Sequence, residues 1–153
     1  MAGSLDYRNL YSLQDRVLSV TYAADTGFYL TGGTCLHRFY AARRYSDDLD
    51  LFCPDVNLFR DYARELQVRL GESGHSFRAV IDSRDFIRLD VEGSLKVDLV
   101  NDRVYRHGRS RLSPEGYKLD NLENLLANEL CAVIWRDEPK DVFDIFTISG
   151  IAP

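Results

Sequence analysis

Three aspartates stand close together in the segment YLTGGTCLHRFYAARRYSDDLDLF, which runs from Tyr29 to Phe52. They are Asp47, Asp48 and Asp50, just ahead of an apolar pair. On a β-strand alternate side chains share a face, so Asp48 and Asp50 would point the same way. Two carboxylates this close repel each other, and a bound cation removes that repulsion. Because oxygen-only ligands suit Mg²⁺ or Mn²⁺ rather than zinc, the pair predicts a divalent-metal site. Asp47 would only finish the turn; the alternative for all three is a solvated acidic turn.

The same segment contains Gly32, Gly33 and Thr34 between a predicted strand and a predicted helix. Glycines let a backbone approach a phosphate closely, and a helix N-terminus offers free N–H groups and a positive dipole end. The Thr34 hydroxyl adds a further donor. An anion-binding turn next to a cation site indicates phosphoryl or nucleotidyl transfer, in which metal ions bridge a triphosphate and activate the attacking oxygen. An ordinary tight turn is the alternative.

A third carboxylate is expected from a strand beside the Asp48 strand. Asp98 is the best candidate because it stands among alternating apolar residues in LKVDLV. It would complete the metal site and deprotonate the acceptor hydroxyl. Asp90 is the second choice.

Helices and strands must position these residues. Apolar spacing predicts helices at 6–25, 34–42, 56–72, 121–135 and 139–149. Short or alternating apolar runs predict strands at 28–30, 48–53, 76–82, 85–92 and 94–100, with a hairpin turn at Glu92-Gly93-Ser94. The third helix would bury Leu58, Tyr62, Leu66 and Leu70, and the fourth would carry one apolar stripe of Leu122, Leu125, Leu126, Leu130, Val133 and Ile134.

The order of these elements predicts an α/β or α+β fold, a mixed β-sheet flanked by helices with a short helical C-terminus. At 153 residues the chain is expected to form a single domain, 1–153, with its core at about 28–100 and C-terminal helices at about 121–149. The polar segment 101–116 is the one candidate for a flexible loop or arm.

Composition narrows the class of protein. With 45% hydrophobic and 28% charged residues the chain is globular rather than disordered. The net charge of -5 does not favour general nucleic-acid binding. Cys35, Cys53 and Cys131 are odd in number and widely spaced, which is typical of reduced thiols. We therefore expect a cytoplasmic protein, and no apolar run is long enough to span a membrane.

The motifs resemble those of a known family. A Gly-Gly-Thr turn, a helix and then Asp-x-Asp on the next strand is similar to the signature of the polymerase-beta-like nucleotidyltransferase superfamily. The fuller pattern resembles the AbiEii/AbiGii toxin family, which includes the MenT toxins, with its R-x-S-x-D-L-D-L block at Arg44–Leu51. The family's [KR]-D-x-x-D-[IL] helix is matched at Lys140, Asp141 and Asp144. The resemblance runs from about Phe28 to Phe146.

This resemblance implies a nucleotidyltransferase-type fold and Mg²⁺- or Mn²⁺-dependent transfer of a nucleotide from an NTP to tRNA or another RNA end. It also implies a toxin of a toxin–antitoxin or phage-defence pair, with a cognate antitoxin protein as partner. By motif, Asp48 and Asp50 would be metal ligands and Lys140 with Asp141 would lie near the triphosphate. The implied nucleotide contacts are Gly32, Gly33, Thr34, Arg44 and Ser46.

One position departs from the family pattern. Many members carry lysine where this chain has Glu129, in LANELCA. Helical spacing puts Glu129 on the inward stripe, where a carboxylate should be paired or near a metal. If the family lysine binds the triphosphate, Glu129 reverses the local charge, which Arg44 or Lys140 would compensate. A catalytically inactive nucleotide-binding or interaction domain of the same fold therefore stays open.

The acceptor also stays open. Arg103, Arg106, Arg109 and Arg111 could hold an RNA backbone or could belong to a solvated loop. The acidic net charge suits a small-molecule nucleotidyltransferase better than an RNA-directed one.

Overall fold

The structure is a computed structural model that describes residues 6–23, 26–103, 106–136 and 138–151. The predicted helix end at Asp25 lies outside these residues. Asp6 begins the first helix as expected, because its carboxylate accepts hydrogen bonds from the backbone N–H groups of Arg8 and Asn9, at 3.1 and 3.3 Å.

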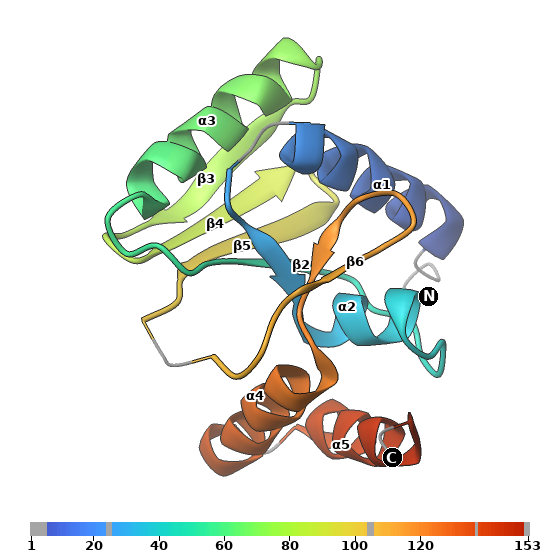
Figure 1. Cartoon of the computed structure of the whole chain (residues 1–153). Helices are drawn as coiled ribbons and strands as arrows, with labels where there is room; N and C mark the ends of the chain where they lie inside the picture. Colours follow the sequence, from blue (N-terminus) through green and yellow to red (C-terminus); the bar gives the residue numbers. More distant parts are fainter. Residues whose placement is uncertain (1–5, 24–25, 104–105, 137, 152–153) are drawn as a thin grey trace. The chain divides into compact units, whose positions relative to one another are not determined.

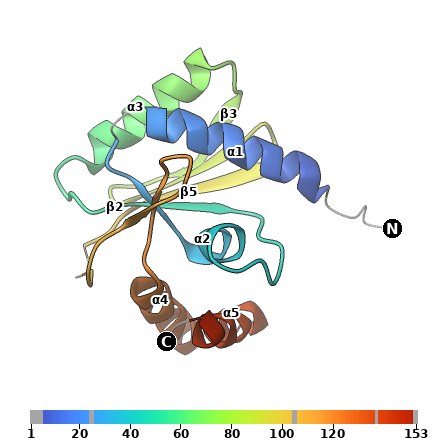
Figure 2. The same ribbon diagram turned by 45° about the vertical axis from the view of Figure 1, so that its right-hand side comes forward.

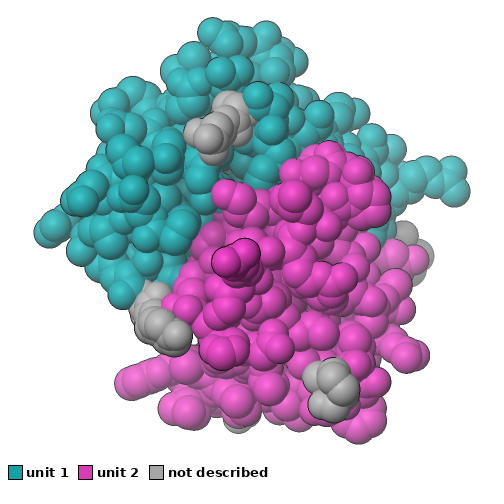
Figure 3. All heavy atoms as spheres, in the orientation of Figure 1, with its two compact units in different colours: residues 1–28, 47–103 teal, residues 29–46, 104–153 magenta. Residues whose placement is uncertain are grey.

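The chain divides into two compact units, which are coloured separately in Figure 3. Unit 1 comprises residues 1–28 and 47–103, and unit 2 comprises residues 29–46 and 104–153. The predicted acidic strand belongs to unit 1 and the predicted glycine turn to unit 2. Each unit has its own helices and strands.

The described residues of unit 1 form two helices and four strands, which are labelled in Figure 1. They are α1 (Tyr7–Ala23), β2 (Leu49–Cys53), α3 (Phe59–Glu72), β3 (Phe77–Asp82), β4 (Phe86–Val91) and β5 (Leu95–Asn101). The strand order is β3-β4-β5-β2. The outer pairs β3–β4 and β4–β5 are antiparallel, whereas β2 runs parallel to β5.

These strands have one apolar and one polar face. The apolar face consists of Leu49, Leu51, Cys53, Ile87, Leu89, Val91, Leu95, Val97 and Leu99, all buried. Helices α1 and α3 pack against each other and against β5, and they cover this face (Figure 2). Because side chains alternate along each strand, the other face carries Asp50, Arg88 and Asp98.

Two local features of unit 1 bear on the sequence predictions. The hairpin turn between β4 and β5 is confirmed, because Glu92 and Gly93 both have positive φ, 54° and 68°, as a type I′ turn requires. The predicted start of α3 was wrong. Residue Asp55 makes a turn that ends with a backbone hydrogen bond from Leu58, so the helix begins only at Phe59.

The buried face of α3 shifts accordingly. Its buried residues are Phe59, Ala63, Leu66 and Leu70. Leu58, predicted to be inward, precedes the helix and is 36% exposed.

The described residues of unit 2 form three helices and three strands. They are β1 (Tyr29–Thr31), α2 (Gly32–Phe39), β6 (Arg111–Leu112), β7 (Lys118–Leu119), α4 (Leu122–Trp135) and α5 (Pro139–Ile151). Strand β7 pairs in parallel with β1 and antiparallel with β6. Helix α2 packs against both α4 and α5, which pack against each other.

Helix α4 is apolar on more than one face, so the single predicted stripe was wrong. Leu125 is buried, but Leu130 and Ile134 are 48% and 76% exposed. Trp135 follows at 87%, and α5 exposes Phe146 at 77%. When two sides of a helix are apolar, the spacing of its apolar residues does not show which side faces the core.

The predicted flexible segment is tied to α4. The Asn121 side chain caps α4 by accepting from the Asn124 N–H at 2.8 Å, and it donates to the carbonyls of His107 and Arg109. Part of the segment also forms β6, whose two residues are too few to show alternation in sequence.

The predicted mixed α/β architecture is confirmed, with seven strands and five helices among the described residues. Within that part of the chain no helix has both the length and the apolarity needed to cross a bilayer.

Candidate active site

The acidic residues of unit 1 gather on its polar sheet face. Asp50 and Asp98 are Cα partners on the parallel strands β2 and β5, which brings them to neighbouring positions about 4.8 Å apart. Asp48 precedes Asp50 by two residues and is half-buried like it. The structure thus places Asp98 on the strand beside the Asp48–Asp50 strand, as the sequence predicted. Whether the three are metal ligands remains a prediction.

Two basic side chains share this face. Arg88 donates from Nε to Asp98 Oδ1 at 2.8 Å and from Nη2 to Oδ2 at 3.0 Å. Lys96 Nζ lies 3.0 Å from Asp48 Oδ2. The hydrogen bonds that Arg88 donates to Asp98, with the charges of Asp98, Asp48 and Asp50, raise the pKa of Arg88 above its usual value. All three predicted carboxylates therefore act on one guanidinium.

The donor set suits a hard divalent cation, since it supplies carboxylate oxygens from adjacent strands. Among the residues that the structure describes, no three His, Cys, Asp or Glu side chains are already arranged around a common metal position. Arg88 and Lys96 supply the positive charge instead. Binding of Mg²⁺ or Mn²⁺ by Asp98 would therefore require its ion pair with Arg88 to open.

The other acidic candidates have other partners. Asp90 of β4 lies opposite Lys96 of β5, and its carboxylate contacts Arg78 at 3.4 Å. Asp47 is exposed, and its backbone carbonyl accepts a hydrogen bond from the buried Gln14 amide at 3.2 Å.

In unit 2 the glycine pair forms the start of α2 rather than a turn before it. Gly32 has φ +76°, a conformation that L side chains rarely adopt. The Thr34 hydroxyl is fully buried and donates to Ser46 Oγ at 2.8 Å. Thr34 and Ser46 are therefore brought together, and their bond holds the start of α2 against the segment that leads to Asp47.

Arg44 lies over Gly33. A Cβ at Gly33 would stand 2.5 Å from Arg44 Nη2 and 3.0 Å from Ser46 Oγ, so only glycine allows this approach. Arg44 donates from Nε and Nη2 to the two carboxylate oxygens of Asp144, at 2.9 and 2.7 Å. Burial alone would lower the pKa of Arg44, but these hydrogen bonds and the Asp144 charge raise it.

Asp144 is itself buried and has a second partner. Its Oδ1 lies 2.6 Å from Nε2 of His37, whose side chain is fully buried. Burial works to raise the pKa of Asp144, but the hydrogen bonds from His37 and Arg44 hold it below its usual range.

A second buried acidic pair joins α4 to α5. Burial, the Asp144 charge and a hydrogen bond with Asp141 raise the pKa of Glu129 to about 8. Glu129 is thus a neutral acid at neutral pH and donates to Asp141, which also accepts two hydrogen bonds from Arg136, at 2.9 and 2.8 Å. The prediction that Glu129 faces inward is confirmed; it shares a hydrogen bond with Asp141, whereas its Oε2 is buried without a partner among the described residues.

Lys140 and Asp141 lie in different surroundings. Asp141 is 1% exposed, whereas Lys140 is exposed and contacts Glu138 Oε2 at 3.3 Å. The two are consecutive on α5, and 100° of helical rotation separates their side chains. That both residues lie near a triphosphate stays a prediction.

The four arginines of the predicted RNA patch also differ. Arg106 is paired with Asp120 and stacks on the Tyr29 ring, with its guanidinium carbon 3.4 Å from the ring centroid. The Arg106 side chain is 19% exposed. In unit 1, Arg103 pairs with Asp85 at 2.9 Å.

Arg109 and Arg111 are exposed, and Arg111 lies over the Tyr40 ring. These two remain candidates for an acceptor-binding surface.

Sequence reasoning missed several partners of these residues: His37, Arg88, Lys96 and Arg136. The D-x-x-D spacing pointed to Asp144, but nothing in the sequence links it to His37, 107 residues away.

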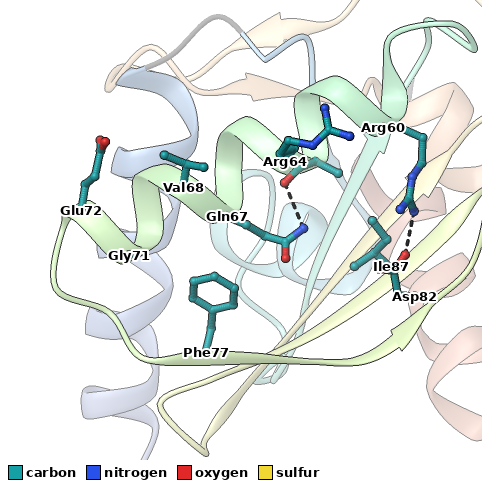
Figure 4. A pocket seen from close by; sticks show the side chains of 10 residues that line it. Arg60, Arg64, Gln67, Val68, Gly71, Glu72, Phe77, Asp82 and Ile87 are labelled. Carbon is teal, nitrogen blue, oxygen red and sulfur yellow. Dashed lines mark hydrogen bonds and ion pairs between the residues drawn. The ribbon is translucent and has the colours of Figure 1, made fainter.

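A groove of about 520 Å³ lies elsewhere in unit 1, between α3 and β3 (Figure 4). Phe77, Val68 and Ile87 form its apolar part, and Arg60 pairs with Asp82 at its end, at 2.7 Å. None of its lining residues is a predicted site residue.

The chain matches a family model described as "Nucleotidyl transferase AbiEii toxin, Type IV TA system" over residues 16–151. A search of curated protein sequences found no match.

Among solved structures, JHP933 from Helicobacter pylori is similar with a TM-score of 0.66 and 20% identity, over 93% of this chain and 65% of that one. The Megavirus polyadenylate synthase is similar with a TM-score of 0.67 and 15% identity, over 93% of this chain and 32% of that one. The likeness establishes the fold. The chain spans slightly less than two thirds of the Helicobacter protein and about a third of the viral enzyme.

Proposed function

We propose, because the chain belongs to the AbiEii nucleotidyltransferase toxin family, that it transfers a nucleotide from an NTP to a hydroxyl acceptor in a metal-dependent reaction. The observation that carries the proposal is the in-register position of Asp50 and Asp98 on parallel strands. The charge of Asp48 acts with theirs on the Arg88 guanidinium. Family membership alone would fit a protein that had lost its acidic residues. Here they are present and lie together.

The polar face of unit 1 supplies the reactive groups. Asp48 and Asp50 would hold Mg²⁺ or Mn²⁺, together with Asp98 if its ion pair with Arg88 opens. The bound cation would polarise the α-phosphate and lower the pKa of the attacking hydroxyl. Asp98 accepts the proton of that hydroxyl, a bond forms between the acceptor oxygen and the α-phosphorus, and pyrophosphate leaves.

Unit 2 supplies the phosphate contacts. The backbone N–H groups of Gly32 and Gly33 and the guanidinium of Arg44 bind the triphosphate. The buried Thr34 and Ser46 hydroxyls hold the two chain segments in place. Lys140, which is exposed, supplies a further positive charge, and the buried Asp141 orients α5 through Arg136.

The acceptor we propose is tRNA or another RNA, held through the exposed Arg109 and Arg111. A small-molecule hydroxyl is the second candidate, favoured by the ion pair that engages Arg106 with Asp120 and by the net charge of -5. We further propose that the protein acts in the cytoplasm as a toxin and that an antitoxin protein restrains it.

The test is label transfer from each of the four α-labelled NTPs to total tRNA, total RNA and small hydroxyl acceptors, with Mg²⁺ or Mn²⁺. We expect transfer by the wild type, loss in Asp48→Ala and retention in Asp47→Ala, a matched exposed neighbour. Metal-dependent NTP binding without transfer to any acceptor would refute the enzyme and leave a nucleotide-binding domain. Equal transfer by both variants would refute the metal-ligand role.

A further inference from the structure

His37 is a fully buried histidine that the proposed chemistry does not use. It lies on α2, and Nε2 contacts Asp144 Oδ1 of α5 at 2.6 Å, while Phe143 stacks on its ring with centroids 6.0 Å apart. The sequence alone offered no role for His37. Its position suggests one, because it contacts Asp144, which in turn holds the Arg44 guanidinium over Gly33.

The Asp144 carboxylate joins His37 to Arg44. Oδ1 accepts from both His37 Nε2 and Arg44 Nε, and Oδ2 accepts from Arg44 Nη2. A planar carboxylate held at one oxygen by the imidazole has a fixed rotation. The two parallel bonds to Arg44 then fix the plane of the guanidinium.

We propose that His37 is a positioning residue, which acts through Asp144 to hold the Arg44 guanidinium at Gly33 for binding of an NTP phosphate. The proposal rests on the proposed function, since it takes the triphosphate as the anion that Arg44 meets.

The donor count of Arg44 leaves capacity for that anion. A guanidinium has five N–H groups. The described residues engage one on Nε and one on Nη2 through Asp144, and one on Nη1 through the Tyr45 carbonyl at 2.9 Å. One N–H on each terminal nitrogen remains, and a rigid pair of donors is suited to two phosphate oxygens.

The second ring nitrogen of His37 faces two different backbone groups. Nδ1 lies 3.2 Å from the Ala41 carbonyl and 3.4 Å from the Arg43 N–H. An imidazolium donates to Ala41 and to Asp144, whereas the neutral ring accepts from Arg43 and still donates to Asp144. Both states therefore hold the carboxylate, but only the imidazolium adds positive charge.

The experiment compares His37→Leu, His37→Gln and the control His75→Gln, a histidine of unit 1 that pairs with Glu92. The Arg44 Nε–H resonance, assigned by its loss in Arg44→Lys, is followed by NMR without nucleotide. Binding of each of the four NTPs with Mg²⁺ is measured without acceptor. We expect His37→Leu to broaden or shift the resonance and to raise the dissociation constant on the order of tenfold.

His37→Gln keeps a donor toward Asp144 and should restore most of the affinity. His75→Gln should change neither readout.

An Arg44 resonance that is unchanged in His37→Leu, or an NTP affinity of His37→Gln that is no higher than that of His37→Leu, would overturn the positioning role. If the resonance depends on His37 but no NTP binds to the wild type, the nucleotide function fails and the His37–Asp144–Arg44 linkage stands. His37→Gln keeps the test decisive if His37→Leu does not fold.

Discussion

Replacing Glu129 with glutamine should stabilise the protein, and more so as the pH rises. The wild-type carboxyl is buried beside Asp141 and Asp144 and must keep its proton in the folded state. A glutamine amide can donate to Asp141 in the same place and has no proton to lose. The variant therefore keeps the hydrogen bond and removes the titration.

The magnitude follows from proton linkage. Burial, the Asp144 charge and the bond with Asp141 raise the pKa of Glu129 from 4.5 to about 8 in the folded chain. Between these values the unfolded chain releases a proton that the folded chain retains, so wild-type stability falls as pH rises through this window and levels off above it. At about 1.4 kcal/mol for each pKa unit, a full effect would be roughly 4–5 kcal/mol. Relaxation and partial hydration of the pair reduce the expectation to about 2 kcal/mol, or 4 to 8 °C in Tm.

The assay is thermal unfolding of wild type and Glu129→Gln from pH 5 to pH 9, with the exposed Glu123→Gln of the same helix as control. The Tm difference between Glu129→Gln and wild type should be small at the acid end, grow with pH and become constant above about pH 8. A difference that is the same at every pH, or that shrinks as the pH rises, would refute the neutral-acid interpretation.

Three further outcomes are expected. Gly33→Ala should lower the unfolding free energy by about 1–3 kcal/mol and weaken NTP binding, because the new Cβ would meet Arg44 Nη2 at 2.5 Å. In the control Gly71→Ala the new Cβ would have no atom within 4 Å, so calorimetry should show unchanged NTP binding. Asp98→Asn should abolish nucleotide transfer while the protein stays folded by circular dichroism, since a neutral amide cannot take the acceptor proton; residual transfer near the wild-type level would contradict its role. The single tryptophan, Trp135, should show solvent-exposed fluorescence that is readily quenched by iodide, because 87% of its surface is accessible; strong protection from quenching at low protein concentration would contradict this.

The sequence predicted the sheet best where alternation was strong. Asp98 could be assigned to the strand beside Asp50 because both stand in runs of alternating apolar residues, whereas the parallel direction of the two strands was not predicted. Boundaries failed where local hydrogen bonds compete with helix formation, as at Asp55. The apolar sides of α4 could not be told apart, since Leu125 and Ile134 are equally apolar in sequence but only Leu125 faces the core.

The acidic residues of the candidate site were predicted from the sequence, but its basic residues were not. Aspartates at Asp48 and Asp50 were visible from spacing, whereas the Arg88 and Lys96 that neutralise this face come from other strands and match no motif. The burial of each side chain could not be predicted from the spacing of the motif residues. Lys140 and Asp141 are adjacent in sequence, but helical rotation sends only Asp141 into the interior.

The central claim is that the chain transfers the nucleotide rather than the terminal phosphate, and parallel reactions with α-labelled and γ-labelled NTPs test it most directly. With Mg²⁺ or Mn²⁺ and an acceptor, the α-label should become attached to the acceptor, the γ-label should appear only in pyrophosphate, and both should cease in Asp50→Asn. Transfer of the γ-label to the acceptor would contradict the account. So would attachment of the α-label and release of labelled pyrophosphate by Asp50→Asn at the wild-type rate.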